Sequence, residues 1–228
     1  MSDLDKVYEL RFYSVEAGRD QDMRARVQQD LKWLFPRHNI RPVGGWSSTS
    51  APKLPLFVYI TPFADMLERN RCWNGFYTDP SWQEVRNRTN AGSELVEDYE
   101  IWFVKEVLPW KDAPEGGPGS IDEIVFLETL VGKSGPAGQA LRESEIPAYE
   151  RAGATVMGVF DVISGGKLPG SLAFLRWPNW ETRAASAGIL QSDPALTARR
   201  ADEKSTYGKT LIGKTGSYLL DPVTVDWD

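Results

Sequence analysis

The sequence predicts an α+β fold built from two tandem copies of one βαββαβ unit, whose sheets pack face to face as an α/β barrel. The first observation is an internal repeat, in which residues 7–90 lie over residues 121–204 without a gap and thirteen positions are identical. Ordinary composition would give about five identities by chance. The second observation is the consecutive match of Lys53-Leu54-Pro55 with Lys167-Leu168-Pro169. The third is geometric: two helices cover only one face of a four-stranded sheet, so a second copy is the expected cover for the other.

Hydrophobic periodicity predicts the elements of each copy. Residues 6–15 alternate as a strand, and residues 19–38 carry apolar side chains at helical spacing, at Met23, Val27, Leu31 and Leu34. The first copy continues with strands over 40–48 and 56–62, a helix over 63–77, a short helix from Pro80 and a strand over 95–106. We expect the second copy to repeat this order, with Leu95 matching Leu211 in the last strand.

Capping signals support these boundaries in both copies. Asp79-Pro80 and Asp193-Pro194 each place an N-cap carboxylate before a proline at the first helical position. Asn39 and Gly153 share the slot after the first helix, where a positive φ is needed and these two residue types adopt it most easily. Pro147 falls inside the first helix of the second copy and predicts a kink there.

The same pattern predicts the domain organisation. Residues 1–111 form the first repeat and residues 121–228 the second, more divergent one. Between them, residues 112–120 are rich in glycine and proline and are expected to form a linker.

Composition limits the classes of function. The net charge of -6 and the scattered basic residues argue against a nucleic-acid partner. No apolar run approaches the ~18 residues of a membrane span, and the acidic start is unlike a signal peptide. The single cysteine, Cys72, fits a reducing compartment, so a cytoplasmic location is expected.

Several motifs of the first copy resemble those of a known family. They are the strand 7–13, the segments 37–40 and 43–46, the segment 63–69, and Asp79-Pro80-Ser81-Trp82. Their order and spacing are similar to those of NIPSNAP proteins, within the dimeric α/β-barrel superfamily. The second copy keeps Gly158, Arg183 and Asp193-Pro194 but, of the first strand, only Glu123. The resemblance implies ferredoxin-like repeats forming a barrel. It implies little about function, because the superfamily includes oxygenases, cyclases, isomerases, lyases and haem enzymes.

Strand alternation yields a candidate site. If Tyr8, Leu10 and Phe12 face the helices, the alternate residues of that strand point into the barrel. The predicted inward set combines catalytic candidates with substrate-binding ones: Glu9, Arg11 and Glu100 for catalysis, and Tyr13, Tyr59, Trp102 and Glu123 for binding. An aromatic cavity with a few converging charges is typical of a small-molecule pocket. Glu9 or Glu100 would be the general base and Arg11 would stabilise a developing enolate or carboxylate. We also expect Arg11 to lie within salt-bridge reach of Glu9 or Glu100.

Other candidates have simpler explanations. His38, the only histidine, ends a helix, where it is expected to cap carbonyl groups, and Cys72 is expected to be a small buried side chain. Haem proteins on duplicated barrels take their axial histidine from the second repeat, which here has none. The sequence contains neither a metal-binding motif nor the motif of a phosphate-binding loop, so no cofactor is expected.

Two functions therefore remain open. The first is a cofactor-independent enzyme, an isomerase, lyase or cyclase that acts by proton transfer on a small, partly apolar molecule in the barrel cavity. The second is a non-catalytic binding or scaffold protein, in which Glu9 and Arg11 form a structural ion pair and the barrel is filled. The expected partner is a small-molecule substrate, with neither a membrane nor nucleic acid involved. Association of copies through their outer faces stays open.

Overall fold

The computed structural model describes residues 6–112 and 117–227. Residues 1–5, on which the expectation of no signal peptide rests, and residues 113–116 of the predicted linker lie outside the described residues. The fold is mixed α/β, and the chain divides into two compact units. Within the described residues, none of the helices is long and apolar enough to cross a membrane.

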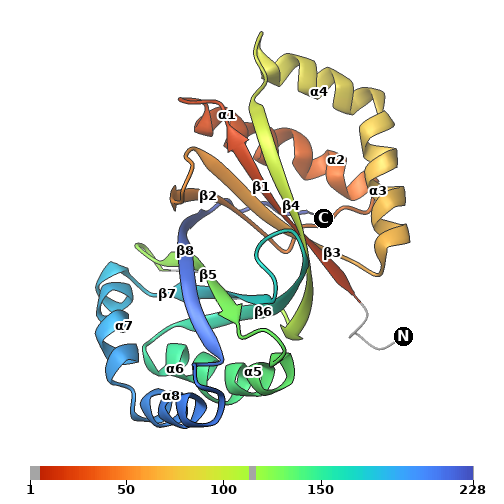
Figure 1. The fold of residues 1–228 in the computed structure, drawn as a ribbon. Helices are drawn as coiled ribbons and strands as arrows, with labels where there is room; N and C mark the ends of the chain where they lie inside the picture. The colour runs from red at the N-terminus through yellow and green to blue at the C-terminus, as the bar shows by residue number, and fades with distance from the viewer. Residues whose placement is uncertain (1–5, 113–116, 228) are drawn as a thin grey trace. The chain divides into compact units, whose positions relative to one another are not determined.

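The first unit comprises residues 6–105 together with residues 220–227. Its antiparallel sheet has the strand order β2-β3-β1-β4. The strands are β1 (Val7–Val15), β2 (Gly44–Ser50), β3 (Leu56–Phe63) and β4 (Val96–Leu108). One long helical segment follows β1 and consists of α1 (Asp20–Ala25), the π-helical turn η2 (Arg26–Leu31) and α2 (Lys32–Arg37). Helices α3 (Met66–Thr78) and α4 (Pro80–Asn90) connect β3 to β4 (Figure 1).

The second unit, residues 106–219, has the same order of elements. Its sheet order is β6-β7-β5-β8. The strands are β5 (Ile121–Thr129), β6 (Thr155–Ser164), β7 (Gly170–Trp177) and β8 (Ile212–Pro222). The helical segments are α5 (Ser134–Ala140), η3 (Leu141–Glu145), α6 (Ile146–Arg151), α7 (Trp180–Ser192) and α8 (Pro194–Tyr207) (Figure 1).

The element bounds agree with the offset that the sequence predicts. Val7 pairs with Phe63 between β1 and β3, and Ile121 pairs with Trp177 at the matching place between β5 and β7. Asp79 and Asp193 each cap the helix that follows, by accepting a hydrogen bond from a backbone N–H. The predicted positive φ is found at Asn39 (54°) and at Gly153 (99°). Barrel closure by the two sheets concerns the relative placement of the units and stays a prediction.

The long helix is irregular in both units. A π-helical turn interrupts it at η2 and again at η3, which directly precedes α6, the helix that contains Pro147. The first unit has Trp33 in the slot of Pro147 and contains the same turn, and its own helix proline is Pro36 of α2.

The C-terminal segment lies with the first unit. The backbone N–H of Val223 donates to the carbonyl oxygen of Gly45 over 2.8 Å, and the ring of Trp227 stacks on Phe35 at 5.7 Å. Arg24 forms an ion pair with Asp221 at 2.6 Å. Contacts therefore assign residues 220–227 to the first unit, whereas the predicted second domain ran to residue 228.

Candidate functional site

The two faces of β1 are opposite to the prediction. Val7 and Val15 belong to a core cluster with Leu34 of α2 and Trp73 of α3, so the odd-numbered residues of β1 face the helices. Tyr59 of β3 packs in the same cluster. The prediction that Glu9, Arg11, Tyr13 and Tyr59 point away from the helices is therefore wrong. Period-two alternation separates two sets of side chains, but almost all of β1 is buried, so hydrophobicity cannot tell which set meets the helices.

The assignment for β4 is correct, and this divides the predicted catalytic set. Glu100 lies opposite Phe12 in the register of β1 and β4, and Trp102 contacts the ring of Phe12 at 5.2 Å. Glu100 is exposed and accepts a hydrogen bond from Trp102 over 3.2 Å. Glu100 and Trp102 thus lie on the sheet face opposite to Glu9, and they do not share a site with it.

A buried ion pair forms the base of the site. Glu9 and Arg11 are each 1% exposed, and the guanidinium Nε of Arg11 donates to Glu9 Oε1. Arg69 of α3 donates to the other carboxylate oxygen, Oε2. The predicted contact between Arg11 and Glu9 is confirmed. Because guanidinium groups hold both oxygens of Glu9, this carboxylate has no side open toward a substrate.

Helix α3 places aromatic side chains over this pair. Its N-cap Asp65 accepts a hydrogen bond from the backbone N–H of Glu68 over 2.7 Å, and so sets the start of the helix. Arg69, Trp73 and Tyr77 follow at four-residue spacing and share one helix face. The Trp73 ring centroid lies 3.6 Å from the guanidinium carbon of Arg11, which is a cation–π contact.

The second edge of the Arg11 guanidinium meets phenolic groups. Its Nη1 donates to the hydroxyl of Tyr13 over 2.8 Å and to that of Tyr77 over 2.9 Å. The hydroxyls of Tyr13 and Tyr59 are 2.7 Å apart. Arg11 thus polarises a short chain of hydroxyl groups, whose outermost member, Tyr77, is 44% exposed.

Electrostatics keep Arg11, Tyr59 and Tyr77 in their ordinary protonation states at neutral pH. Burial by itself would lower the pKa of Arg11, but the oxygens of Tyr59 and Tyr13 and the Glu9 carboxylate raise it above its usual value. Burial raises the pKa of Tyr59 and that of Tyr77. The site therefore presents a permanent cation and neutral hydroxyl donors, an arrangement suited to an oxyanion.

These groups line a pocket of about 480 Å³ on the helix side of the first unit. The pocket combines aromatic rings with several guanidinium groups, and its lining residues include Arg11, Arg26, Arg69, Trp73, Phe76, Tyr77, Trp82, Arg86, Glu94 and Tyr99. Its volume and mixed lining are those of a small-molecule site.

The equivalent place in the second unit keeps the ion pair and loses the rest. Arg183 donates to Glu123 Oε1 over 2.8 Å, as Arg69 does to Glu9, and Lys214 and Trp177 also donate to Glu123. Burial would raise the pKa of Glu123, but hydrogen bonds from Arg183 and Ser217 lower it. Aliphatic residues take the slots of Arg11, Tyr13, Tyr59 and Trp73, namely Val125, Leu127, Ala173 and Ala187. The recorded partners of Glu123 therefore all come from the second unit, as those of Glu9 come from the first.

His38 and Cys72 have structural surroundings. The Nε2 atom of His38 lies 2.9 Å from Asp79 Oδ2, so the imidazole contacts the N-cap of α4 rather than a helix carbonyl. These contacts lower the pKa of Asp79, with the hydrogen bond from His38 as the largest cause. Cys72 is buried, as expected, and its thiol lies 3.9 Å from the carbonyl oxygen of Asn39.

Sequence reasoning missed Arg69, Trp73 and Tyr77 as site residues. Two signals could have found them: Arg69 and Glu9 are both identical in the two copies, and the four-residue spacing puts all three missed residues on one face of α3.

Comparison with solved structures shows the fold of the whole chain. A protein from Lactobacillus acidophilus NCFM named "putative monooxygenase" has a TM-score of 0.59 at 9% identity, covering 98% of this chain and 97% of its own. An anthrone oxidase-like protein has a TM-score of 0.55 at 11% identity, with 96% and 92% covered. At such identities the likeness concerns the fold alone. A NIPSNAP domain protein from Burkholderia xenovorans covers 48% of this chain and 99% of its own, at 20% identity and a TM-score of 0.36.

Comparison by sequence identifies one domain. None of the curated proteins matches the chain. The family model described as NIPSNAP matches residues 8–105, which include β1, the Glu9–Arg11 pair and helix α3. The first unit of this chain therefore carries a NIPSNAP domain.

Proposed function

We propose that the first unit binds a small, partly apolar molecule in its helix-side pocket and stabilises an oxyanion on it, as a cofactor-independent enzyme of the isomerase, lyase or cyclase type. The observation that carries the proposal is Arg11, a fully buried guanidinium whose charge reaches the pocket through the hydroxyls of Tyr13 and Tyr77. Donors fixed in advance around a buried cation stabilise an enolate or phenolate more strongly than water does.

The roles in this proposal differ from those expected from the sequence. Arg11 keeps its oxyanion role and Tyr77 becomes the donor that meets the substrate. Glu9 becomes a positioning residue, since both of its oxygens hold guanidinium groups. Two proteins of similar fold carry enzyme names, one as a "putative monooxygenase" and one as anthrone oxidase-like. A cytoplasmic location and association through outer faces remain part of the proposal.

The second candidate function is non-catalytic binding. It is favoured because the carboxylate in the described lining of the pocket already accepts hydrogen bonds on both oxygens. Among the described residues that line the pocket, Glu94 is the carboxylate, and its two oxygens accept hydrogen bonds from Arg86 and Asn90. A protein that only binds an anion would need the donors but no base.

Carbon–hydrogen exchange separates the two candidates. Anthrone is a suitable probe, because loss of its methylene proton produces a stable aromatic oxyanion. In deuterated buffer without oxygen, NMR should show faster exchange of that proton with the protein than without it. Tyr77→Phe should slow the exchange by about a hundredfold to a thousandfold, because one oxyanion donor is removed.

The matched control is Tyr99→Phe. Tyr99 lines the same pocket and is 60% exposed, but its hydroxyl makes no recorded hydrogen bond with the described residues. This variant should exchange like the wild type. Binding of anthrone without any acceleration would exclude the enzyme and leave the binding protein.

A further inference from the structure

Arg26 is a buried cation with neutral partners. It belongs to the π-helical turn η2 and is 4% exposed. Its Nε donates to the hydroxyl of Thr89 and its Nη2 to the side-chain oxygen of Asn90, both over 2.7 Å. No hydrogen bond to its third nitrogen, Nη1, is recorded among the described residues. A guanidinium taken out of water is costly unless an anion accompanies it.

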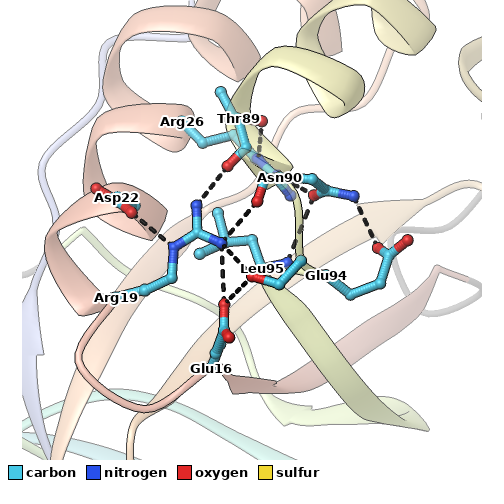
Figure 2. Close-up of polar contacts among 9 residues, drawn as sticks. Glu16, Arg19, Asp22, Arg26, Thr89, Asn90, Glu94 and Leu95 are labelled. Carbon is cyan, nitrogen blue, oxygen red and sulfur yellow. Dashed lines mark hydrogen bonds and ion pairs between the residues drawn. The ribbon is translucent and has the colours of Figure 1, made fainter.

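The neighbouring Arg19 differs from Arg26 because carboxylates balance its charge. Figure 2 shows Arg19 between Glu16 and Asp22, with Arg26 beside Thr89. Arg19 donates to Asp22 over 2.7 Å and to Glu16 over 3.0 Å, so its charge is balanced by two carboxylates.

Two carboxylates lie close enough for their charges to act on Arg26, but each forms its ion pair with another arginine. Asp30 forms its ion pair with Arg88 and Glu94 forms its ion pair with Arg86, each at 2.5 Å. Within residues 6–112 and 117–227, Arg26 itself has no ion pair within 4.0 Å. Burial, followed by the charges of Arg19 and Arg86, lowers the pKa of Arg26 to about 10, so it still carries its proton at neutral pH.

Arg26 lines the same pocket as Arg11 and is accompanied there by flat aromatic side chains. Its guanidinium carbon lies 5.8 Å from the ring centroid of Trp82, and the rings of Trp82 and Phe76 are 4.7 Å apart. The pocket therefore offers aromatic surfaces beside a positive charge that the protein does not neutralise.

The fold itself does not require this cation. Ala140 occupies the slot of Arg26 in the second unit, where it is also buried. Arg200, which corresponds to Arg86, there forms an ion pair with Glu145 at 3.0 Å. Arg86 and Arg200 are thus each paired with a carboxylate, and the uncompensated cation is specific to the first unit, because the second unit has no cation in the slot of Arg26.

We propose that Arg26 binds the carboxylate of an aromatic acid whose planar body packs on Phe76 and Trp82. This inference rests on the proposed function of the pocket and adds the class of its ligand. An acid of this kind would meet the two buried guanidinium groups of the pocket in different ways, its carboxylate at Arg26 and its reacting oxygen at Tyr77 and Arg11.

Two probes of the same shape test the proposal. Calorimetric titration at neutral pH compares 1-naphthoate with the uncharged 1-naphthamide. The wild type should bind the carboxylate about tenfold to a hundredfold more tightly, the usual effect of a hydrogen bond to a charged group. Arg26→Met should remove this preference and leave the affinity for the amide within about twofold, because the removed contact is specific to the charge.

Arg19→Met is the matched control, because Arg19 lies in the same cluster but is neutralised and does not line the pocket. It should keep the preference. If Arg26→Met does not fold by circular dichroism, Arg26→Ala serves instead, since the second unit folds with alanine in that slot. Equal binding of both probes by the wild type, or a preference that survives the loss of Arg26, overturns the proposal but leaves the pocket's function standing. If neither probe binds, both proposals fail.

Discussion

The two units of this chain share one buried ion pair and differ in what surrounds it. In each, a glutamate on the first strand accepts hydrogen bonds from an arginine on the helix after the third strand, Glu9 from Arg69 and Glu123 from Arg183. The first unit adds Arg11 and the aromatic side chains of Tyr13, Tyr59 and Trp73 and has a pocket of about 480 Å³, whereas the second has aliphatic side chains in these slots and a pocket of about 290 Å³. The shared pair is part of the frame, and the added residues carry the chemistry that is specific to the first unit.

Removing the carboxylate from the first unit should have the largest effect. Glu9→Gln should lower the free energy of unfolding by about 3–5 kcal/mol, because it leaves Arg11 buried without its counter-ion. Urea denaturation followed by circular dichroism measures this. Glu100→Gln, on the exposed face, should stay within about 0.5 kcal/mol of the wild type. A Glu9→Gln variant as stable as the wild type would show that the pair is not structural.

The same substitution in the second unit should cost less. Glu123→Gln leaves Arg183 and Lys214 unpaired, but their side chains are 25% and 42% exposed and water can solvate them. We expect a loss of about 2–3 kcal/mol at pH 7, below the full cost of breaking a buried pair. A loss equal to that of Glu9→Gln would contradict the proposed difference between the units.

The cost of Glu123→Gln should also depend on pH. The pKa of Glu123 is lowered from its ordinary value of 4.5, so its contribution to stability is present above that value and is lost as the pH falls through the folded-state pKa. The gap in melting temperature between the wild type and Glu123→Gln should therefore narrow on acidification below pH 4.5. A gap that widens instead would show that the folded-state pKa is raised.

The smallest change in stability should come from Tyr77→Phe. The variant loses one hydrogen bond to Arg11 from a side chain that is 44% exposed, so about 1 kcal/mol or less is expected. Its effect on oxyanion stabilisation should be much larger than its effect on stability. If stability and exchange activity fell together, Tyr77 would be part of the frame rather than of the site.

The fold could be predicted largely because the sequence contains two copies of the unit, so each element expected in one copy can be compared with its counterpart in the other. A gap-free offset places each cap, turn and strand of one copy on its counterpart in the other, and the N-caps Asp79 and Asp193 agree with it. The contact between Glu9 and Arg11 was predictable too, since residues two apart on a strand share a face. Which face they share was not, because β1 is buried on both sides and its polar set, Glu9 and Arg11, lies against the helices rather than away from them.

The rest of the site depends on contacts between elements far apart in the sequence. Tyr77 meets Arg11 across 66 residues, and Arg26 meets Asn90 across 64. Nothing in the local sequence of Arg26 indicates that it is buried without a carboxylate, because that follows from where η2 packs against α4. The spacing of Arg69, Trp73 and Tyr77 was visible, but its meaning depends on the face of β1 beneath them.

The return of residues 220–227 to the first unit bears on how the chain is made. Phe35, Gly45 and Arg24 receive their partners Trp227, Val223 and Asp221 from the end of the described sequence. During synthesis from the N-terminus, the residues that match the NIPSNAP model emerge long before those partners do. The first unit therefore cannot complete its packing as it leaves the ribosome. It therefore stays incompletely packed until the whole of the second unit has been translated.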